Sequence, residues 1–210
     1  MKIAHVVLLP LVLGAAHQSL AAEACGALKS LKIADAHVTL AEEVAPNPEW
    51  KLPPSLFTGP AAPPIGPRST KTPFCRVALT LGKENHIEVW LPHAWNGAFE
   101  GVGNGGLSGA INYPAMATAL DGGYATASTD TGHQTDNFFD TGWIQNHPER
   151  VINFGHRGHH LMAVAAKQVI AKYYDKALRK SYFNGCSSGG WQGLTEAQKY
   201  PNDYDGIVAG

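Results

Sequence analysis

The sequence lacks the features that mark a nucleic-acid-binding or membrane-spanning protein. It has no run of lysine or arginine, and its 16 basic and 17 acidic residues leave a formal net charge of -1 at pH 7. It therefore offers no positive patch for phosphates, and we expect no nucleic-acid partner. The longest apolar run, residues 6–16, is about 11 residues long and too short to cross a hydrocarbon core of ~30 Å. We expect no membrane span.

That short apolar run belongs to a segment with the pattern of a secretory signal peptide. Lys2 provides a positive start, and Ser19-Leu20-Ala21 places small residues where a signal peptidase cuts. We predict a signal peptide over residues 1–21 and a mature chain over 22–210, secreted or periplasmic. A membrane anchor is the alternative, and the length of the run disfavours it.

Cysteine is scarce as well, with Cys25, Cys75 and Cys186 the only three. In an oxidising compartment, an odd number leaves one thiol without a partner. A bridge between Cys25 and Cys75 would close a loop of about 50 residues, worth roughly 4 kcal/mol. That loop contains a proline-rich segment, residues 46–73, which cannot bury much surface by itself. The alternative is two unpaired, buried thiols.

The rest of the chain alternates short extended runs with helical patterns, without an internal repeat. A single domain over residues 22–210 suits this length and composition. The alternation implies right-handed βαβ crossovers, and therefore an α/β fold with a mainly parallel sheet. The predicted strands are 75–81, 86–91, 98–102, 124–129, 181–184 and 206–209, and the predicted helices are 113–120, 158–174 and one that ends near residue 200.

The stretch NGCSSGG, residues 184–190, fits G-x-S-x-G, the nucleophile elbow of serine hydrolases. Ser187 lies between a predicted strand and a predicted helix, with Gly185 and Gly189 as the small residues that so sharp a turn requires. The helix N-terminus favours a developing oxyanion, and the Ser188 amide is the first donor we expect. A glycine-rich turn without chemistry is the alternative. Ser188 is a poorer nucleophile candidate, because it lacks glycines at both positions two residues away.

A second oxyanion donor is expected in the loop GNGGLSG, residues 103–109. This loop follows the predicted strand 98–102 and precedes a helix. Gly105 and Gly106 are the best candidates, since glycine lets the backbone approach a substrate carbonyl closely. Each such donor typically lowers the barrier by about 3 kcal/mol. A flexible surface loop is the alternative.

A serine nucleophile needs a base, yet all ten histidines precede Ser187. In α/β-hydrolases the chain order is serine, acid, histidine, so an elbow at residue 187 expects its base later in the chain. We therefore interpret the sequence as the N-terminal portion of a longer hydrolase.

Other polar residues fit structural roles better than catalytic ones. His133 follows a predicted strand, and a satisfied structural histidine is favoured over a residue at the site edge. His156, His159 and His160 in GHRGHH resemble a metal cluster, but no acidic or cysteine ligand accompanies them in this motif. The start of a helix is the favoured interpretation. Asp205 precedes a strand, whereas a triad acid would follow a later one, so a role in a turn is favoured.

Five segments, EVWLP, WNGAFEGVGNGG, STDTGH, YFNGCSSGGWQG and YPNDYDGIVAG, together resemble the tannase and feruloyl esterase family. Members of that family are secreted serine esterases with an α/β-hydrolase fold. The resemblance runs from about Cys25 to the last residue and covers less than half of a typical member. It implies that Ser187 is the nucleophile and that an aromatic ester is the substrate. It also implies that Cys186 pairs with a cysteine immediately after the catalytic histidine, and that Cys25 and Cys75 form another family disulfide.

The resemblance further implies what this sequence does not contain. The triad aspartate and histidine, the last strands, and a lid domain that carries a calcium ion belong to the C-terminal part of family members. We therefore expect an α/β-hydrolase fold truncated after the strand that follows the elbow helix, with no cofactor within this chain. The 210-residue chain is expected to be inactive or nearly so, with an exposed sheet edge that favours aggregation.

Two other functions stay open at this point. One is a non-catalytic short form that binds phenolic or cell-wall ligands, and the other is a serine peptidase with the same fold. Trp191 departs from the family pattern, since many members have arginine there. We expect tryptophan at this position to alter the packing of side chains beneath the elbow.

Overall fold

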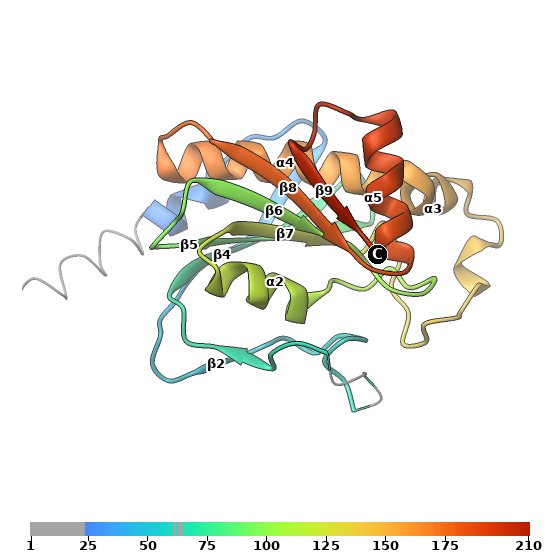
Figure 1. Cartoon of the computed structure of the whole chain (residues 1–210), viewed down its shortest axis with the longest axis horizontal. Coiled ribbons are helices and arrows are strands. Elements are labelled where there is room, and N and C mark those ends of the chain that lie inside the picture. The colour runs from blue at the N-terminus through green and yellow to red at the C-terminus, as the bar shows by residue number, and fades with distance from the viewer. Residues whose placement is uncertain (1–23, 61, 63–64) are drawn as a thin grey trace, which may run out of the picture.

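A seven-stranded sheet with helices on both faces forms the centre of the molecule (Figure 1). The computed structural model describes residues 24–60, 62 and 65–210, so the predicted signal peptide lies outside the described residues. The strands follow the order β1 (Ala36–Val44), β4 (Phe74–Leu81), β5 (Asn85–Pro92), β7 (Ala125–Thr129), β6 (Ala98–Val102), β8 (Lys180–Gly185) and β9 (Gly206–Ala209).

The sheet is mixed, which confirms the α/β class and corrects the prediction of a mainly parallel sheet. The pairs β1–β4, β4–β5 and β5–β7 are antiparallel. The pairs β7–β6, β6–β8 and β8–β9 are parallel. A short turn joins β4 to β5, and strands joined by so short a turn pair antiparallel. Parallel pairing is therefore confined to the half of the sheet that leads to Ser187.

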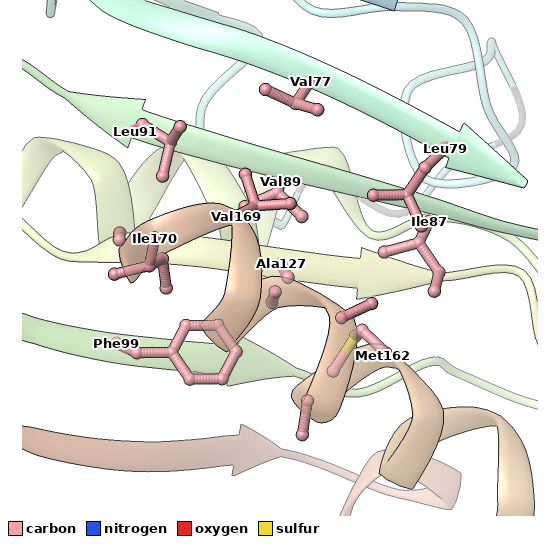
Figure 2. Close-up of a cluster of buried hydrophobic side chains, with 14 of the residues drawn as sticks. Val77, Leu79, Ile87, Val89, Leu91, Phe99, Ala127, Met162, Val169 and Ile170 are labelled. Atoms are coloured by element: carbon pink, nitrogen blue, oxygen red, sulfur yellow. The ribbon is translucent and has the colours of Figure 1, made fainter. Parts of the chain in front are cut away.

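Helix α4 (Gly158–Tyr174) has the predicted bounds and covers one face of the sheet. Its apolar residues recur at helical spacing and pack against the strands. Figure 2 shows this core, in which side chains from α4 meet side chains from β4, β5, β6 and β7. The buried residues labelled there are Val77, Leu79, Ile87, Val89, Leu91, Phe99, Ala127, Met162, Val169 and Ile170.

Helix α2 (Tyr113–Asp121) covers the opposite face, over a second core cluster that includes Phe74 and Trp90. The short strands β2 (Trp50–Lys51) and β3 (Ser69–Thr70) pair within the proline-rich segment. Trp50 packs edge-on against Phe74 and Trp90, with ring centroids 5.3 and 5.4 Å away. The proline-rich segment is thus held on this face by an aromatic contact.

Several elements were not predicted from the sequence. These are β1, β2, β3, η1 (Leu28–Ser30), η2 (Gly142–Ile144), α3 (Pro148–Ile152) and the π-helix η3 (Asn153–Arg157). The segments α3, η3 and α4 follow one another without a break, so the helix start expected near residue 158 is instead a change of helical geometry. No helix in the described parts of the chain is long and apolar enough to span a membrane.

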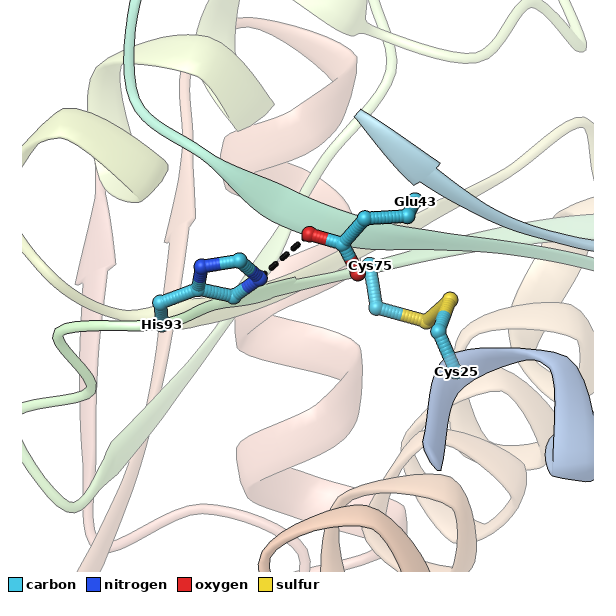
Figure 3. Close-up of a disulfide and its surroundings, with 4 residues drawn as sticks. All are labelled: Cys25, Glu43, Cys75 and His93. Carbon is cyan, nitrogen blue, oxygen red and sulfur yellow. Dashed lines mark ion pairs between the residues drawn. A yellow bond between two sulfur atoms is a disulfide. The ribbon is translucent and has the colours of Figure 1, made fainter. Parts of the chain in front are cut away.

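The predicted bridge between Cys25 and Cys75 is confirmed, and the alternative of two unpaired thiols is wrong (Figure 3). The two cysteines are fully buried, and their Cα atoms are 5.6 Å apart. The bridge ties the segment before η1 to β4 at the centre of the core. Beside it, His93 forms an ion pair with Glu43 of β1. Cys186 is free and exposed.

Candidate active site

Ser187 occupies a sharp turn between β8 and α5 (Ser188–Lys199), as the elbow motif predicts. Its backbone has φ 60° and ψ −122°, a conformation that residues with a side chain rarely adopt. The Ser187 amide donates to the carbonyl of Gly210 at 2.7 Å, and the Gly189 amide donates to the carbonyl of Cys186 at 3.0 Å. The serine is exposed, so the fold holds a strained residue at the surface.

Because the backbone of Ser187 is strained, we expect that glycine at this position makes the folded state more stable. We expect Ser187→Gly to raise the free energy of unfolding by about 1 kcal/mol, because glycine adopts this conformation without steric cost. Urea denaturation followed by circular dichroism measures the change. Ser188→Gly is the matched control, since it places glycine in the first turn of a helix and is expected to be slightly destabilising. A less stable Ser187→Gly variant would contradict the assigned strain.

The glycines that flank Ser187 allow the turn to close. A Cβ atom added at Gly185 would lie 2.3 Å from the carbonyl oxygen of Gly189, and one at Gly189 would lie 2.8 Å from the carbonyl oxygen of Asn104. Both contacts are with backbone, which has little room to move away. The two small residues of the motif are therefore a steric requirement of this structure.

This crowding gives a testable prediction at Gly185. We expect Gly185→Ala to lower the free energy of unfolding by about 1–3 kcal/mol, the usual cost of overpacking. Gly155→Ala is the control, because a Cβ atom there meets nothing within 4 Å. Equal denaturation midpoints for the two variants would show that the elbow tolerates a methyl group at residue 185.

The loop over residues 103–109 is buried at its two ends and half-buried at residues 105–107, which argues against the alternative of a flexible surface loop. Asn104 is 3% exposed and Ser108 is fully buried. The Leu107 amide donates to the carbonyl of Phe138 at 2.6 Å. A Cβ atom at Gly106 would lie 2.4 Å from that same carbonyl oxygen, and Gly106 has φ +63°. Glycine is thus required where the loop passes Phe138.

The sequence predicts three oxyanion-hole donors, and none of these backbone amides donates a hydrogen bond among the described residues. They are the amides of Ser188, Gly105 and Gly106. Ser188 is the first residue of α5, where helix amides are free and the helix dipole is positive. Contacts between Gly103 and Gly189 bring the loop against the elbow. A free amide at Ser188 therefore follows the exposed Ser187 directly, and the loop over residues 103–109 lies against the same turn.

No histidine pairs with Ser187 among the hydrogen bonds of the described residues. His86 pairs with Asp130, and His160 pairs with Asp203, each at 2.6 Å. His156 meets the hydroxyl of Tyr200 at 2.8 Å, and His159 meets Asn104. The three histidines of GHRGHH therefore form hydrogen bonds or ion pairs with three different residues. Neither there nor elsewhere among the described residues do three or more His, Cys, Asp and Glu side chains gather to hold a metal ion.

The residues assigned structural roles from the sequence have such roles. His133 is 4% exposed, stacks on Trp143 at 3.8 Å between centroids, and pairs with the Leu107 carbonyl at 3.2 Å. Burial lowers its pKa. It thereby braces the loop over residues 103–109. Asp205 accepts from the Lys180 ammonium and the Ser181 amide, both at 2.8 Å, and so ties the turn before β9 to β8.

A cavity of about 1000 Å³ lies between the β4–β5 turn, α3 and α4, and its lining does not include Ser187. Trp191, one turn into α5, is 45% exposed and lies 5.7 Å from the ring of Phe154. Sequence reasoning did not find the buried partners of Asn104, which are His159 and Gln192. They lie 55 and 88 residues away, and no local pattern marks them.

A mixed sheet with helices on both faces and a strained serine between a strand and a helix define an α/β-hydrolase. Comparison with known proteins supports this class and identifies the family within it. The family described as "Tannase and feruloyl esterase" matches residues 74–210. This chain belongs to the tannase and feruloyl esterase family.

Individual relatives are similar over nearly all of this chain but only part of their own length. A probable feruloyl esterase B of Aspergillus clavatus is 39% identical over 193 residues, which are 89% of this chain and 35% of the relative. The chain thus spans about a third of the length of such curated relatives. The crystal structure of feruloyl esterase B from Aspergillus oryzae has a TM-score of 0.75 at 34% identity, over 90% of this chain and 37% of that one. Another Aspergillus oryzae esterase has a TM-score of 0.77 at 32% identity, over the same shares.

Proposed function

We propose that this chain provides the nucleophile and the oxyanion hole of a carboxylic ester hydrolase that cleaves phenolic-acid esters. The observation that carries the proposal is Ser187, held at a positive φ between β8 and α5 and followed directly by the unbonded amide of Ser188. The nature of the substrate is supported by relatives that are feruloyl esterases by name.

The reaction follows from the chemistry of a serine nucleophile. The Ser187 hydroxyl oxygen attacks the ester carbonyl carbon while a general base takes the hydroxyl proton. The amides of Ser188 and of Gly105 or Gly106 donate hydrogen bonds to the oxyanion that forms. The tetrahedral intermediate expels the alcohol, which receives the proton, and leaves an acyl group on Ser187. Water then adds with the help of the same base, and the phenolic acid and free serine are released.

The general base and the acid that orients it come from residues outside these 210. Two observations support this part of the proposal. None of the described histidines bonds to Ser187, and the chain spans only about a third of the relatives' length. The exposed thiol of Cys186 is next to Ser187, where a disulfide to a cysteine beside the base would hold the two together. The chain alone is expected to be inactive or nearly so.

We place the calcium ion of the family outside these 210 residues. The family resemblance assigns the ion to a lid domain, and the described residues offer no cluster of ligands for it. An extracellular or periplasmic location is consistent with the Cys25–Cys75 disulfide, which persists in oxidising compartments.

The test uses the product of the complete reading frame that contains this sequence. We expect it to hydrolyse methyl ferulate or methyl gallate and to leave the amides of the same acids intact. The preference between the two esters distinguishes a feruloyl esterase from a tannase. Comparable turnover of the amides would identify a peptidase instead, and ligand binding without turnover would identify a non-catalytic protein. Either of these results contradicts the proposal.

A further inference from the structure

Asn104 lies in the loop that contains Gly105 and Gly106. Its backbone amide, its Nδ2 and its Oδ1 all form hydrogen bonds. Its backbone amide donates to Oε1 of Gln192 at 3.0 Å. Its Nδ2 donates to the carbonyls of Ala110 and Thr129, at 2.8 and 2.9 Å. Its Oδ1 meets Nε2 of Gln192 at 3.0 Å and Nε2 of His159 at 2.9 Å. Asn104 is therefore hydrogen-bonded to four residues.

These bonds fix the proton positions. Both hydrogens of Nδ2 go to carbonyl oxygens, so the amide of Asn104 cannot be flipped, and Oδ1 must accept. Nε2 of His159 therefore carries the hydrogen. Nδ1 of His159 has no partner among the described residues. The ring is 2% exposed, and burial lowers its pKa to about 4, so a neutral ring with a single tautomer faces Asn104 at neutral pH.

The partners of the Asn104 backbone amide and of its Oδ1 come from two helices. His159 lies in the first turn of α4, and Gln192 lies in α5, the helix that begins directly after Ser187. Gln192 is 3% exposed. An apolar contact would hold these helices together without the cost of burying polar groups. Hydrogen bonds are directional, so the bond from the Asn104 amide to Gln192 also fixes the orientation of the peptide between Gly103 and Asn104.

We infer that His159 and Gln192 are positioning residues for the oxyanion hole, and that they act through Asn104 to set where the amides of Gly105 and Gly106 lie relative to the Ser188 amide. This inference rests on the proposed function. Neither side chain is expected to touch substrate. A change at either should displace the two glycine amides and leave the Ser188 amide in place, since that amide belongs to α5 itself.

The test is a benzoate titration of the product of the complete reading frame, labelled with ¹⁵N at glycine and serine and followed by amide NMR, because the carboxylate oxygens of benzoate resemble an oxyanion. In the wild type we expect shifts at Ser188 and at Gly105 or Gly106. In Gln192→Met and in His159→Leu the response of the glycine amides should weaken about tenfold or vanish, while that of Ser188 remains. His159→Gln should restore it, because the glutamine amide nitrogen occupies the position of Nε2. His159→Asn should not, and His156→Gln is the matched control.

The outcomes separate the inference from the proposed function. A wild type in which benzoate shifts none of the three amides contradicts the proposed oxyanion hole. A wild-type response that persists unchanged in His159→Leu and Gln192→Met contradicts only the positioning role. A second measurement, the imidazole ¹⁵N spectrum of the wild type, does not depend on the folding of any variant. It should show a neutral ring with hydrogen on Nε2 at pH 8, and the tautomer with hydrogen on Nδ1 alone would overturn the inference.

Discussion

Replacement of both Cys25 and Cys75 by alanine is expected to lower the free energy of unfolding by about 4 kcal/mol. The two cysteines are 50 residues apart in sequence, and a cross-link of that span removes about this much chain entropy from the unfolded state. The closed loop contains β1 and the proline-rich segment. Both reach the core through few apolar side chains, so the bridge carries much of their stability.

The third cysteine provides the control for this prediction. Cys186→Ala changes an exposed, unpaired thiol and should leave the urea midpoint unchanged. A reducing agent should destabilise the wild type and Cys186→Ala equally and have no effect on the double variant. A double variant that unfolds at the wild-type midpoint would show that packing alone holds the N-terminal segment.

Glu196→Gln is expected to make the chain more stable at pH 8 by roughly 3 kcal/mol, and to change little at pH 5. Glu196 is 1% exposed, and its Oε2 has no partner among the described residues. Burial and the nearby Asp203 carboxylate raise its pKa to about 8, while the Lys167 ammonium opposes the shift. The folded state therefore keeps a proton that the unfolded state releases near pH 4.5. The stability that this proton provides is complete below pH 4.5 and is lost as the pH rises through 8.

The pH dependence of urea unfolding measures this effect. The wild type should lose stability between pH 5 and pH 8, and Glu196→Gln should lose much less. Glu149→Gln is the control, because it removes an exposed carboxylate from α3. Parallel curves for the wild type and Glu196→Gln would contradict the raised pKa. Glu196 lies on α5, the helix that begins directly after Ser187, so the protonation of Glu196 affects the stability of the helix that positions the serine.

Local patterns were enough to predict the elements that position Ser187. The apolar spacing of α4 gave its bounds, and the glycines of G-x-S-x-G indicated a turn that the structure closes by backbone contact between Gly185 and Gly189. The exposed edge was expected too. Strand β9 is the last in the sheet, with Val208 65% exposed.

Long-range pairing explains what the sequence did not reveal. Strand β1 is an edge strand whose partner, β4, begins 30 residues after it ends, and its half-exposed residues have no strong apolar pattern. The direction of β5 depends on its hairpin with β4, which a count of strands and helices does not capture. The partners of the histidines in GHRGHH could not be predicted from the local sequence either. His156 and His160 both contact Tyr200, while His159 points inward and bonds to Asn104.

The most direct test of Ser187 as the nucleophile is kcat/KM for methyl ferulate, measured with the product of the complete reading frame and with its Ser187→Ala variant. Loss of a triad nucleophile typically costs on the order of 10⁶ in rate, so the variant should be close to background. Ser188→Ala should keep most of the activity, because it retains the backbone amide. If Ser187→Ala hydrolysed methyl ferulate as fast as the wild type, the elbow would not be the reacting centre.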